Sequence, residues 1–356
     1  MGQTNTVRKR DVIGFGALNV DLIYDVPREA FSLLARFDPS SPFQSWESSS
    51  GSAKKGLEPG GEIFGDPEAL APILSLLNRI GRHRSRSGGG SAANTILALS
   101  RMGFDVGYVG KVGCDEHGTF LIESLEGVNT DGIVQGDRSG LCLILLDEEG
   151  ERSNLVFPNA NDTLTYDEVE LSYIQDTKFL HFTSFVGERP FEAQIKVAQN
   201  LPPEIRLSFD PGELYARRGL EQLLPILKNT YILFATDREI QLIMDSPYRG
   251  GAKQLLDTGP HIAVCKLGAK GSYVVSSDCE WEIPAQETQV VDKTGAGDVY
   301  AAGFLAGLLL ERPIAECAHL ATEAAALSIG GYGRAQYPDR AFLHRCIGLF
   351  PVKRET

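Results

Sequence analysis

Three small residues stand directly before a carboxylate in the last quarter of the sequence. Gly295, Ala296 and Gly297 precede Asp298, and the apolar run "VYAAGFLAGLLL" follows. A helix that begins near Gly297 has four N–H groups without intrahelical partners and carries the positive end of its dipole there. Because the glycines lack a Cβ, an anion can approach this backbone closely, and a carboxylate beside it can accept a proton. The pattern indicates phosphoryl transfer to a hydroxyl, although a strand–helix turn with Asp298 as a cap also fits.

A second glycine cluster opens another predicted helix. It lies in "SGGGSAANTILALSRMG", residues 87–103, and it places Asn94 one turn into the helix. A further pair, Gly14 and Gly16, begins like a dinucleotide-binding fingerprint. Asn19, however, occupies the position of the third glycine, and strand-like residues follow instead of a helix. These two departures exclude a Rossmann-type NAD site.

The acidic composition limits the classes of partner. The 356 residues include 34 Lys and Arg against 47 Asp and Glu, a formal net charge of −13. Such a chain is repelled by nucleic acid and by an anionic membrane, so we expect neither as a partner. The six cysteines lack CxxC spacing, which indicates reduced thiols. With no apolar signal segment at the N-terminus, a cytoplasmic protein is predicted.

Short apolar strands alternate with helices through the middle of the chain. This alternation is typical of βαβ units, which build a parallel sheet covered by helices on both faces. The sequence therefore predicts an α/β fold with a doubly wound, mostly parallel sheet. The expected strands cover 178–185, 205–210, 230–236 and 261–268, and the expected helices cover 188–201, 213–229 and 237–244.

Two segments interrupt this alternation and predict a second, smaller unit. Residues 141–157 contain two apolar stretches around "DEEG", the pattern of a β-hairpin. Residues 38–66 are rich in Ser, Gly and Pro, the composition of a long loop. A helix should follow, with Asp66 as its N-cap and Pro67 in its first position. We expect a large α/β domain over 67–135 and 160–350 with a core strand near 11–17, and a lid over 18–66 and 136–159.

Three motifs carry a family resemblance, in the order "GALNVD", "GGGSAANTILALSRMG" and "DKTGAGDVYAAGFLAGLL". With them the chain resembles the ribokinase or PfkB family of carbohydrate and nucleoside kinases over roughly residues 12–338. The resemblance implies a ribokinase-like fold with a small β-sheet lid, and ATP-dependent phosphorylation of a hydroxymethyl group on a small sugar. It also implies Mg²⁺ as cofactor, ATP as co-substrate and, as in some members, K⁺. A nucleoside of the adenosine type is the alternative acceptor, because "GGSAANT" is closer to adenosine-kinase-type members.

The resemblance implies roles for individual residues. Asp298 matches the catalytic base, and Gly295, Ala296 and Gly297 match the anion hole. The acceptor-binding positions are Asn19, Asp21, Gly89, Gly90 and Asn94. The nucleotide-binding positions are Thr236, Glu239, Lys266, Gly268 and Gly271, with Glu239 holding Mg²⁺ through water. K⁺ would lie at Asp292 and Thr294, in a loop completed by Gly330, Gly331 and Gly333.

Several positions leave alternatives open. Thr236 stands where the family usually has Asn, which removes a hydrogen-bond donor near the magnesium waters. Lys293 stands where the family often has Thr. The basic run 79–87 suits a solvated loop, or an arginine that holds an anionic substrate or the ATP of a neighbouring chain. Glu151, in the hairpin, either reaches the substrate or adds solubility. A non-catalytic sugar or nucleotide sensor is the rival class, and an exposed lid edge favours a homodimer.

Overall fold

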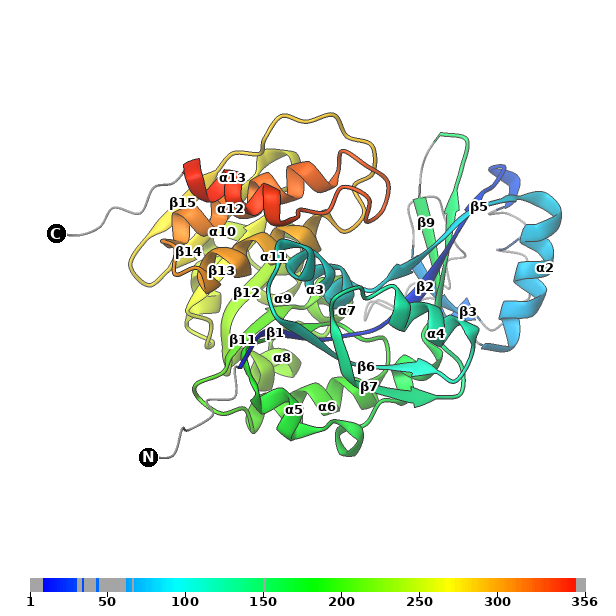
Figure 1. The fold of residues 1–356 in the computed structure, drawn as a ribbon, viewed down its shortest axis with the longest axis horizontal. Helices are drawn as coiled ribbons and strands as arrows, with labels where there is room; N and C mark the ends of the chain where they lie inside the picture. Colours follow the sequence, from blue (N-terminus) through cyan, green and yellow to red (C-terminus); the bar gives the residue numbers. More distant parts are fainter. Residues whose placement is uncertain are drawn as a thin grey trace.

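The computed structural model describes residues 9–30, 34, 43–44, 62–65, 67–149 and 152–349. Asp66, Glu151 and most of the loop expected over 38–66 lie outside the described residues. Two sheets organise the described chain, and Figure 1 shows the smaller one to the right of the larger. No helix within the described residues is long and apolar enough to cross a membrane. All six cysteines are free thiols, as predicted.

The larger sheet holds nine strands within the described residues, in the order β15-β14-β13-β12-β11-β10-β1-β6-β7. The strands from β13 to β7 are parallel, while β14 and β15 run antiparallel at one edge. This confirms the doubly wound, mostly parallel sheet. The strands are β1 (Arg10–Phe15), β6 (Val106–Gly113), β7 (Asn129–Gly136), β10 (Thr177–Thr183), β11 (Arg206–Asp210), β12 (Thr230–Thr236), β13 (Ile262–Lys266), β14 (Ser272–Ser276) and β15 (Glu280–Ile283).

Helices cover both faces of this sheet, so successive residues of a strand enter different cores. Val12 of β1 packs in a core with residues of α3, α11 and α12, whereas Ile13 packs in a core with residues of α6, α8 and α9. Figure 1 shows α11 and α12 above the sheet and α5 and α6 below it. The helices are α2 (Leu70–Ile80), α3 (Ser91–Met102), α4 (Glu116–Glu123), α5 (Leu171–Gln175), α6 (Glu188–Gln199), α7 (Gly212–Ala216), α8 (Gly219–Leu227), α9 (Asp237–Met244), α10 (Tyr248–Leu256), α11 (Ala296–Leu309), α12 (Ile314–Ser328) and α13 (Arg340–Leu349), with 3₁₀ turns η1 (Pro67–Ala69), η2 (Asn159–Thr163), η3 (Tyr166–Glu168) and η4 (Gly268–Lys270).

The smaller sheet holds six strands in the described chain, in the order β3-β4-β9-β8-β2-β5. The predicted hairpin is confirmed, because β8 and β9 pair antiparallel around residues 147–151. The exposed edge strand β5 is where the expected homodimer would pair, which remains a prediction that the mass in solution tests. The strands are β2 (Asn19–Asp25), β3 (Phe43–Gln44), β4 (Glu62–Gly65), β5 (Arg82–Gly89), β8 (Gly140–Leu146) and β9 (Arg152–Phe157).

Two local expectations differ from the structure. The basic run is not a loop: β5 pairs with β2 throughout, so residues 82–89 belong to the smaller sheet rather than to the large domain. Its sequence, "RHRSRSGG", has no β-branched residue, and only pairing with β2 makes it a strand. The helix expected over 213–229 is broken into α7 and α8, because Gly219 adopts a φ of 75° that an uninterrupted helix cannot contain.

Helix α11 packs unusually close to α12. A Cβ on Gly303 would lie 2.7 Å from the Cα of Ala321, and one on Gly307 would lie 2.8 Å from the Cα of Cys317. The missing side chains of Gly303 and Gly307 make this close approach possible. Because backbone meets backbone here, α11 has little freedom to slide, and the residues at its start are held in place.

Adding a methyl group at this contact should destabilise the protein. We expect Gly303→Ala to lower the free energy of unfolding by about 1–3 kcal/mol, since backbone atoms must shift to accommodate the new Cβ. Denaturant unfolding followed by circular dichroism measures this change. Gly348→Ala is the matched control: it lies in helix α13, where a Cβ meets nothing within 4 Å. Equal stability of the Gly303→Ala variant and the wild type would contradict the close helix contact.

Candidate active site

Polar residues gather where the parallel strands of the larger sheet end. Asp210 ends β11, Thr236 ends β12 and Lys266 ends β13. These strands are parallel neighbours in the sheet, so their carboxyl ends lie side by side along one end of the strands. Ligands of open α/β sheets bind at this end of the strands. The carboxyl ends are therefore where the predicted site residues should be found.

The start of α11 brings Asp298 to these carboxyl ends. Gly295 is the N-cap residue with a φ of 72°, and Asp298 lies in the first turn. Of the expected anion-hole amides, that of Ala296 donates to the carbonyl of Lys293 at 3.3 Å. Gly297 faces Lys266, one of the residues expected to bind the nucleotide, since a Cβ there would lie 3.3 Å from Lys266 Nζ. The helix start thus offers the dipole, the bare backbone of Gly297 and a nearby cation to an anion.

The carboxyl group of Asp298 is poised to exchange a proton near neutral pH. Burial raises its pKa to about 7, and the Asp210 carboxylate adds to the increase. The Asn94 amide, which donates to Asp298 Oδ2 at 2.8 Å, lowers the pKa, as do Lys266 and Arg334. A general base works best when its pKa lies near the operating pH. The environment of Asp298 therefore suits the role that its motif predicted.

Asp21 and the second glycine cluster form a wall beside Asp298. In the β2–β5 pair, Asp21 lies opposite Ser87, and its carboxyl oxygens occupy the space above Gly89, where a Cβ would lie 2.5 Å from both. Burial raises the pKa of Asp21 to about 6, while Arg152 and Arg334 lower it. Gly89 is glycine because any side chain would displace this carboxylate.

Gly90 connects this wall to Asp298. It is the N-cap of α3 with a φ of 111°, and a Cβ there would lie 2.1 Å from the carbonyl oxygen of Ala17. The tight turn places Asn94 in the first turn of α3, where its amide reaches Asp298. Asn19 lies at the start of β2, and its Oδ1 accepts a hydrogen bond from Asn161 Nδ2 at 3.0 Å. All five residues expected to bind the acceptor thus lie on one wall or at its base.

Three of the residues expected to bind the nucleotide, Thr236, Glu239 and Lys266, lie in or beside a charged cluster. Lys266 Nζ pairs with Asp210 Oδ2 at 2.5 Å. Burial lowers the pKa of Lys266, but the Asp210 and Glu239 carboxylates outweigh burial and raise it. Thr236 and Glu239 form a capping box at the start of α9: Thr236 N–H donates to Glu239 Oε2 at 2.8 Å, and Glu239 N–H donates to Thr236 Oγ1 at 3.2 Å. Thr236 therefore has a local structural task besides any contact with ligand water.

Oxygen donors are present here for a hard cation. Asp210 and Glu239 supply two carboxylates close enough to Lys266 to raise its pKa. Within the described residues, no group of three or more His, Cys, Asp and Glu side chains is arranged to hold a metal. The donor set fits a Mg²⁺ ion that keeps waters and phosphate oxygens as its other ligands.

The two remaining nucleotide positions lie in a turn. Gly268 and Gly271 have φ angles of 59° and 92°, and they connect β13 to β14 through η4. Leu267 N–H donates to the carbonyl of Gly271 at 2.8 Å, which closes the turn. The residues of η4 are exposed, so the backbone at this end of β13 is open to a ligand.

The predicted K⁺ site brings together the loop before α11 and the loop after α12. Asp292 Oδ1 accepts from Thr294 N–H at 2.9 Å, and its Oδ2 accepts from Gly333 N–H at 3.0 Å. Burial raises the pKa of Asp292, but these hydrogen bonds outweigh it and lower the pKa. Thr294 Oγ1 accepts a hydrogen bond from Arg152. An ionised Asp292 carboxylate fits a monovalent cation. The Thr294 hydroxyl oxygen already accepts a hydrogen bond from Arg152, so it is a weaker candidate ligand.

Several site residues were not found by sequence reasoning. Asp210, Asn161, Arg152 and Arg334 all contact the predicted residues. Asp210 left a signal, because it ends the predicted strand "IRLSFD" as Thr236 and Lys266 end theirs. The other three lie in turns or at strand starts, and only the tertiary structure brings them to the site.

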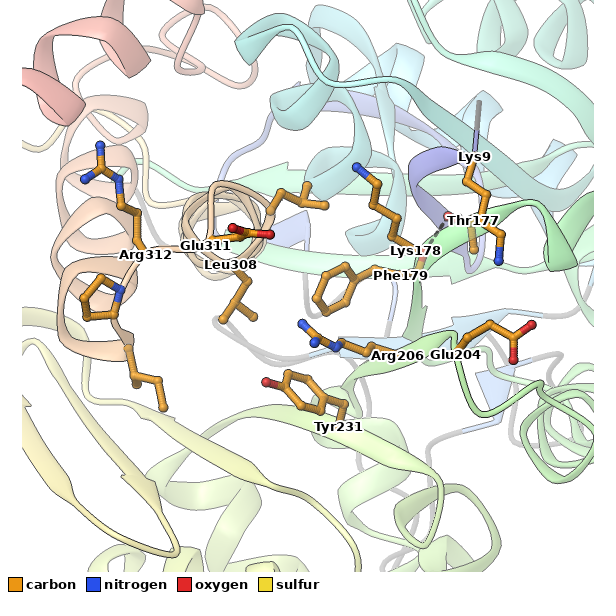
Figure 2. A pocket seen from close by; sticks show the side chains of 13 residues that line it. Lys9, Thr177, Lys178, Phe179, Glu204, Arg206, Tyr231, Leu308, Glu311 and Arg312 are labelled. Carbon is orange, nitrogen blue, oxygen red and sulfur yellow. Dashed lines mark hydrogen bonds between the residues drawn. The ribbon is translucent and has the colours of Figure 1, made fainter. Parts of the chain in front are cut away.

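A separate cavity lies at the amino ends of the central strands of the larger sheet, opposite to the carboxyl ends where the predicted site residues lie (Figure 2). It has a volume of about 660 Å³ and is lined by the first residues of β10, β11 and β12 and by the end of α11. The guanidinium group of Arg206 contacts the rings of both Phe179 and Tyr231 in this cavity. Because α11 rises about 1.5 Å per residue, Leu309 is about 16 Å along the helix from Asp298. The cavity is therefore distinct from the candidate active site.

Comparison with known proteins identifies the family. The model of the pfkB family of carbohydrate kinases matches residues 74–339. An uncharacterised sugar kinase from Archaeoglobus fulgidus is 38% identical over 240 residues, 67% of this chain and 96% of the relative. An ATP-dependent ribose-1-phosphate kinase from Halopiger xanaduensis is 30% identical over 261 residues, 72% of this chain and 85% of the relative. The chain belongs to the pfkB family of carbohydrate kinases.

Solved structures agree on the fold of this pfkB-family protein. A probable sugar kinase from Rhizobium etli has a TM-score of 0.81 at 21% identity, covering 96% of this chain and 100% of that chain. Adenosine kinase from Sinorhizobium meliloti has a TM-score of 0.79 at 24% identity, covering 95% and 99%. The ribokinase-like fold with its lid is confirmed. As a pfkB-family member, the chain is an ATP-dependent sugar or nucleoside kinase.

The raised pKa of Asp298 has a consequence for stability. When ionised, this buried carboxylate destabilises the fold, so Asp298→Asn should raise the free energy of unfolding by roughly 2 kcal/mol at pH 8, after allowance for its partial exposure. The cost is complete above the folded-state pKa of about 7 and disappears as the pH falls towards the unfolded value of 3.8. The gain should therefore be smaller at pH 5.

Urea unfolding of the wild type and the variant at both pH values measures this difference. Asp257→Asn, at an exposed position after α10, is the control for the loss of one carboxylate. A gain of the same size at pH 8 and pH 5 would contradict the raised pKa of Asp298.

Proposed function

We propose that this pfkB-family kinase transfers the γ-phosphoryl group of ATP to a hydroxymethyl group of a small sugar, with Asp298 as the general base. The observation that carries the proposal is the position of Asp298. Asn94 connects it to the acceptor wall, and the neighbouring Gly297 faces Lys266 on the nucleotide side. A base between two substrates can accept the hydroxyl proton as the oxygen attacks phosphorus in line.

On the nucleotide side, this chain's own charges would hold the phosphates. Lys266 places a cation beside Gly297, and the start of α11 adds its dipole. We assign the anion hole to residues 295–297, with the amide of Gly297 as its main donor because that of Ala296 already bonds Lys293. Glu239 and Asp210 would hold Mg²⁺ through water, and Mg²⁺ supplies charge neutralisation on the phosphates.

On the acceptor side, Asp21 and Asn19 would accept hydrogen bonds from sugar hydroxyls. The bare backbone of Gly89 and Gly90 lets the sugar approach closely. The smaller sheet, which carries β2 and β5, would act as the lid and exclude water, so that ATP is not lost to hydrolysis. The position of Asp21 above Gly89 supports this role.

A nucleoside is the alternative acceptor. The names of related proteins cover ribose 1-phosphate, fructose and, among solved structures, adenosine. A sugar is proposed because the family consists of carbohydrate kinases and because Asp21 and Asn19 can accept hydrogen bonds from sugar hydroxyls. A non-catalytic sensor would bind ligand without turnover, and the kinases among the relatives speak against it.

The kinetic test is ADP release in a coupled assay with Mg·ATP. We expect turnover with a sugar from a panel of pentoses, hexoses, their phosphate esters and nucleosides. Asp298→Asn should lower kcat by about 10² or more, because the proton has no acceptor, while the Kd for ATP stays near that of the wild type. Asp257→Asn should retain full activity. Turnover of a nucleoside alone would select the alternative acceptor, and full activity of Asp298→Asn would contradict the assigned base.

K⁺ activation follows from the loop around Asp292. The Asp292 carboxylate accepts a hydrogen bond from Gly333 N–H and would bind a monovalent cation near the start of α11. We expect a rise in kcat when K⁺ replaces tetramethylammonium at constant ionic strength, and a smaller rise in Asp292→Asn. A rate that does not respond to K⁺ in the wild type would remove the cation from the proposal.

A further inference from the structure

Arg334 has two guanidinium nitrogens without a hydrogen-bond partner in the described part of the chain, and they lie beside the residues expected to bind the acceptor. The residue lies in the loop between α12 and α13, and its Nε donates to Asn94 Oδ1 at 3.0 Å. Its Nη1 and Nη2 atoms are buried and have no hydrogen-bond partner among the described residues. Nη1 lies 2.9 Å from the position that a Cβ on Gly88 would take. The free N–H groups thus face β5, beside the glycine above which Asp21 lies.

Buried guanidinium nitrogens without hydrogen-bond acceptors are unusual in a folded protein. A guanidinium group cannot lose its charge in a protein, and its N–H groups each need an acceptor. A buried charge without a partner is strongly unfavourable. Burial accordingly lowers the pKa of Arg334, while the Asp21 carboxylate nearby raises it. Among the described residues no carboxylate forms an ion pair or hydrogen bond with Nη1 or Nη2, so these two atoms can donate to a bound anion.

Arg152 approaches the same region from the lid. It begins β9, and its guanidinium group donates to Asn154 Oδ1 at 3.1 Å and to Thr294 Oγ1. Its charge acts on Asp21, as does that of Arg334. Arg101 adds a further positive charge behind the loop, since it donates to the backbone carbonyl of Arg334. The acceptor wall is therefore flanked by cations on two sides, although the chain as a whole is acidic.

We infer that the acceptor is a sugar that already carries a phosphate group, and that the free Nη1 and Nη2 atoms of Arg334 bind this phosphate, with Arg152 assisting from the lid. The inference rests on the kinase activity and the acceptor side proposed above. The planar guanidinium fork matches a phosphate with two parallel hydrogen bonds. A phosphate monoester carries a charge of about −1.5 to −2 at neutral pH, which suits two arginines better than the single charge of a sugar acid. The hydroxymethyl group would lie at the other end of the sugar, beside Asp298.

The affinities for sugars, their phosphate esters and a sugar acid distinguish a phosphorylated acceptor from a neutral or carboxylate acceptor. We would titrate the full chain, with Mg²⁺ and the non-hydrolysable analogue AMP-PNP filling the nucleotide side, in a calorimeter. The ligands are ribose, fructose and glucose, their esters ribose 1-phosphate, fructose 6-phosphate and glucose 1-phosphate, and gluconate as a carboxylate. We expect at least one ester to bind at least about 10-fold more tightly than its parent sugar, as charge-assisted hydrogen bonds require.

Three variants test the assigned residues. Arg334→Gln should weaken binding of that ester by about 10-fold or more and binding of the parent sugar by less than about 3-fold. Arg334→Lys, which keeps the charge but not the fork, should fall between the two. Arg345→Gln, an exposed charge loss on α13, is the matched control and should leave both affinities unchanged. Thermal unfolding should show Arg334→Gln to be folded, and if it is not, Arg152→Gln should show a smaller but ester-selective loss.

The results that overturn the inference are distinct. Esters that bind no better than their parent sugars, or a binding preference for gluconate, would remove the phosphate. A loss of AMP-PNP affinity in Arg334→Gln, without an ester-selective loss, would move Arg334 to the nucleotide side. Turnover of a neutral sugar that Arg334→Gln leaves unchanged would overturn the inference while the proposed kinase function stands. Ester binding through Arg334 with no ADP release from any acceptor would contradict the proposed function and leave the inference intact.

Discussion

The fixed position of the start of α11 is the constraint on which the rest of the site depends. Gly303 and Gly307 bring the helix into backbone contact with α12, so that it cannot slide along its axis. At its first turn, Asn94 and Thr95 of α3 hold the side chain and the carbonyl of Asp298 through hydrogen bonds of 2.8 and 3.1 Å. Two helices from distant parts of the sequence thereby hold one carboxylate at the end of the sheet. Its burial raises its pKa, and the burial follows from this packing.

The electrostatics of the site differ from those of the whole chain. The net charge is −13, yet the groups around Asp298 and Asp21 include Lys266, Arg152 and Arg334. The local charges divide into two groups. Lys266 is balanced by Asp210 and Glu239, and this cluster suits a nucleotide with its metal ion. Within the described residues, Nη1 and Nη2 of Arg334 have no hydrogen-bond partner, and Arg334 lies on the side proposed for the acceptor. An acidic protein can therefore bind anions where its fold concentrates cations.

The register of the smaller sheet determines how the residues proposed to bind the acceptor are arranged. Asn19 pairs with Gly89 and Asp21 with Ser87, so that the Asp21 carboxylate lies above a residue without a side chain. A shift of one residue would turn Asp21 to the other face. The same sheet carries Arg152 at the start of β9, whose guanidinium group reaches Thr294 near the start of α11. The lid is thus connected to the loop of the predicted K⁺ site by a side-chain contact.

The sequence by itself determined the alternation of strands and helices, the hairpin of β8 and β9, and the glycine-rich start of α11 with its acid, because these depend on local periodicity and on short motifs. The strand β5 escaped prediction, since its charged residues become a strand only by pairing with β2. The break between α7 and α8 at Gly219 was not predicted either, because a helical sequence pattern does not reveal a positive φ angle. Arg334 directly follows Gly333 of the predicted K⁺ loop and Arg152 lies in the predicted hairpin, yet no local pattern distinguishes either of them from a surface arginine. Only the tertiary structure decided that their guanidinium groups meet at the site, because long-range packing alone determines which charges lose their water and which remain without a partner.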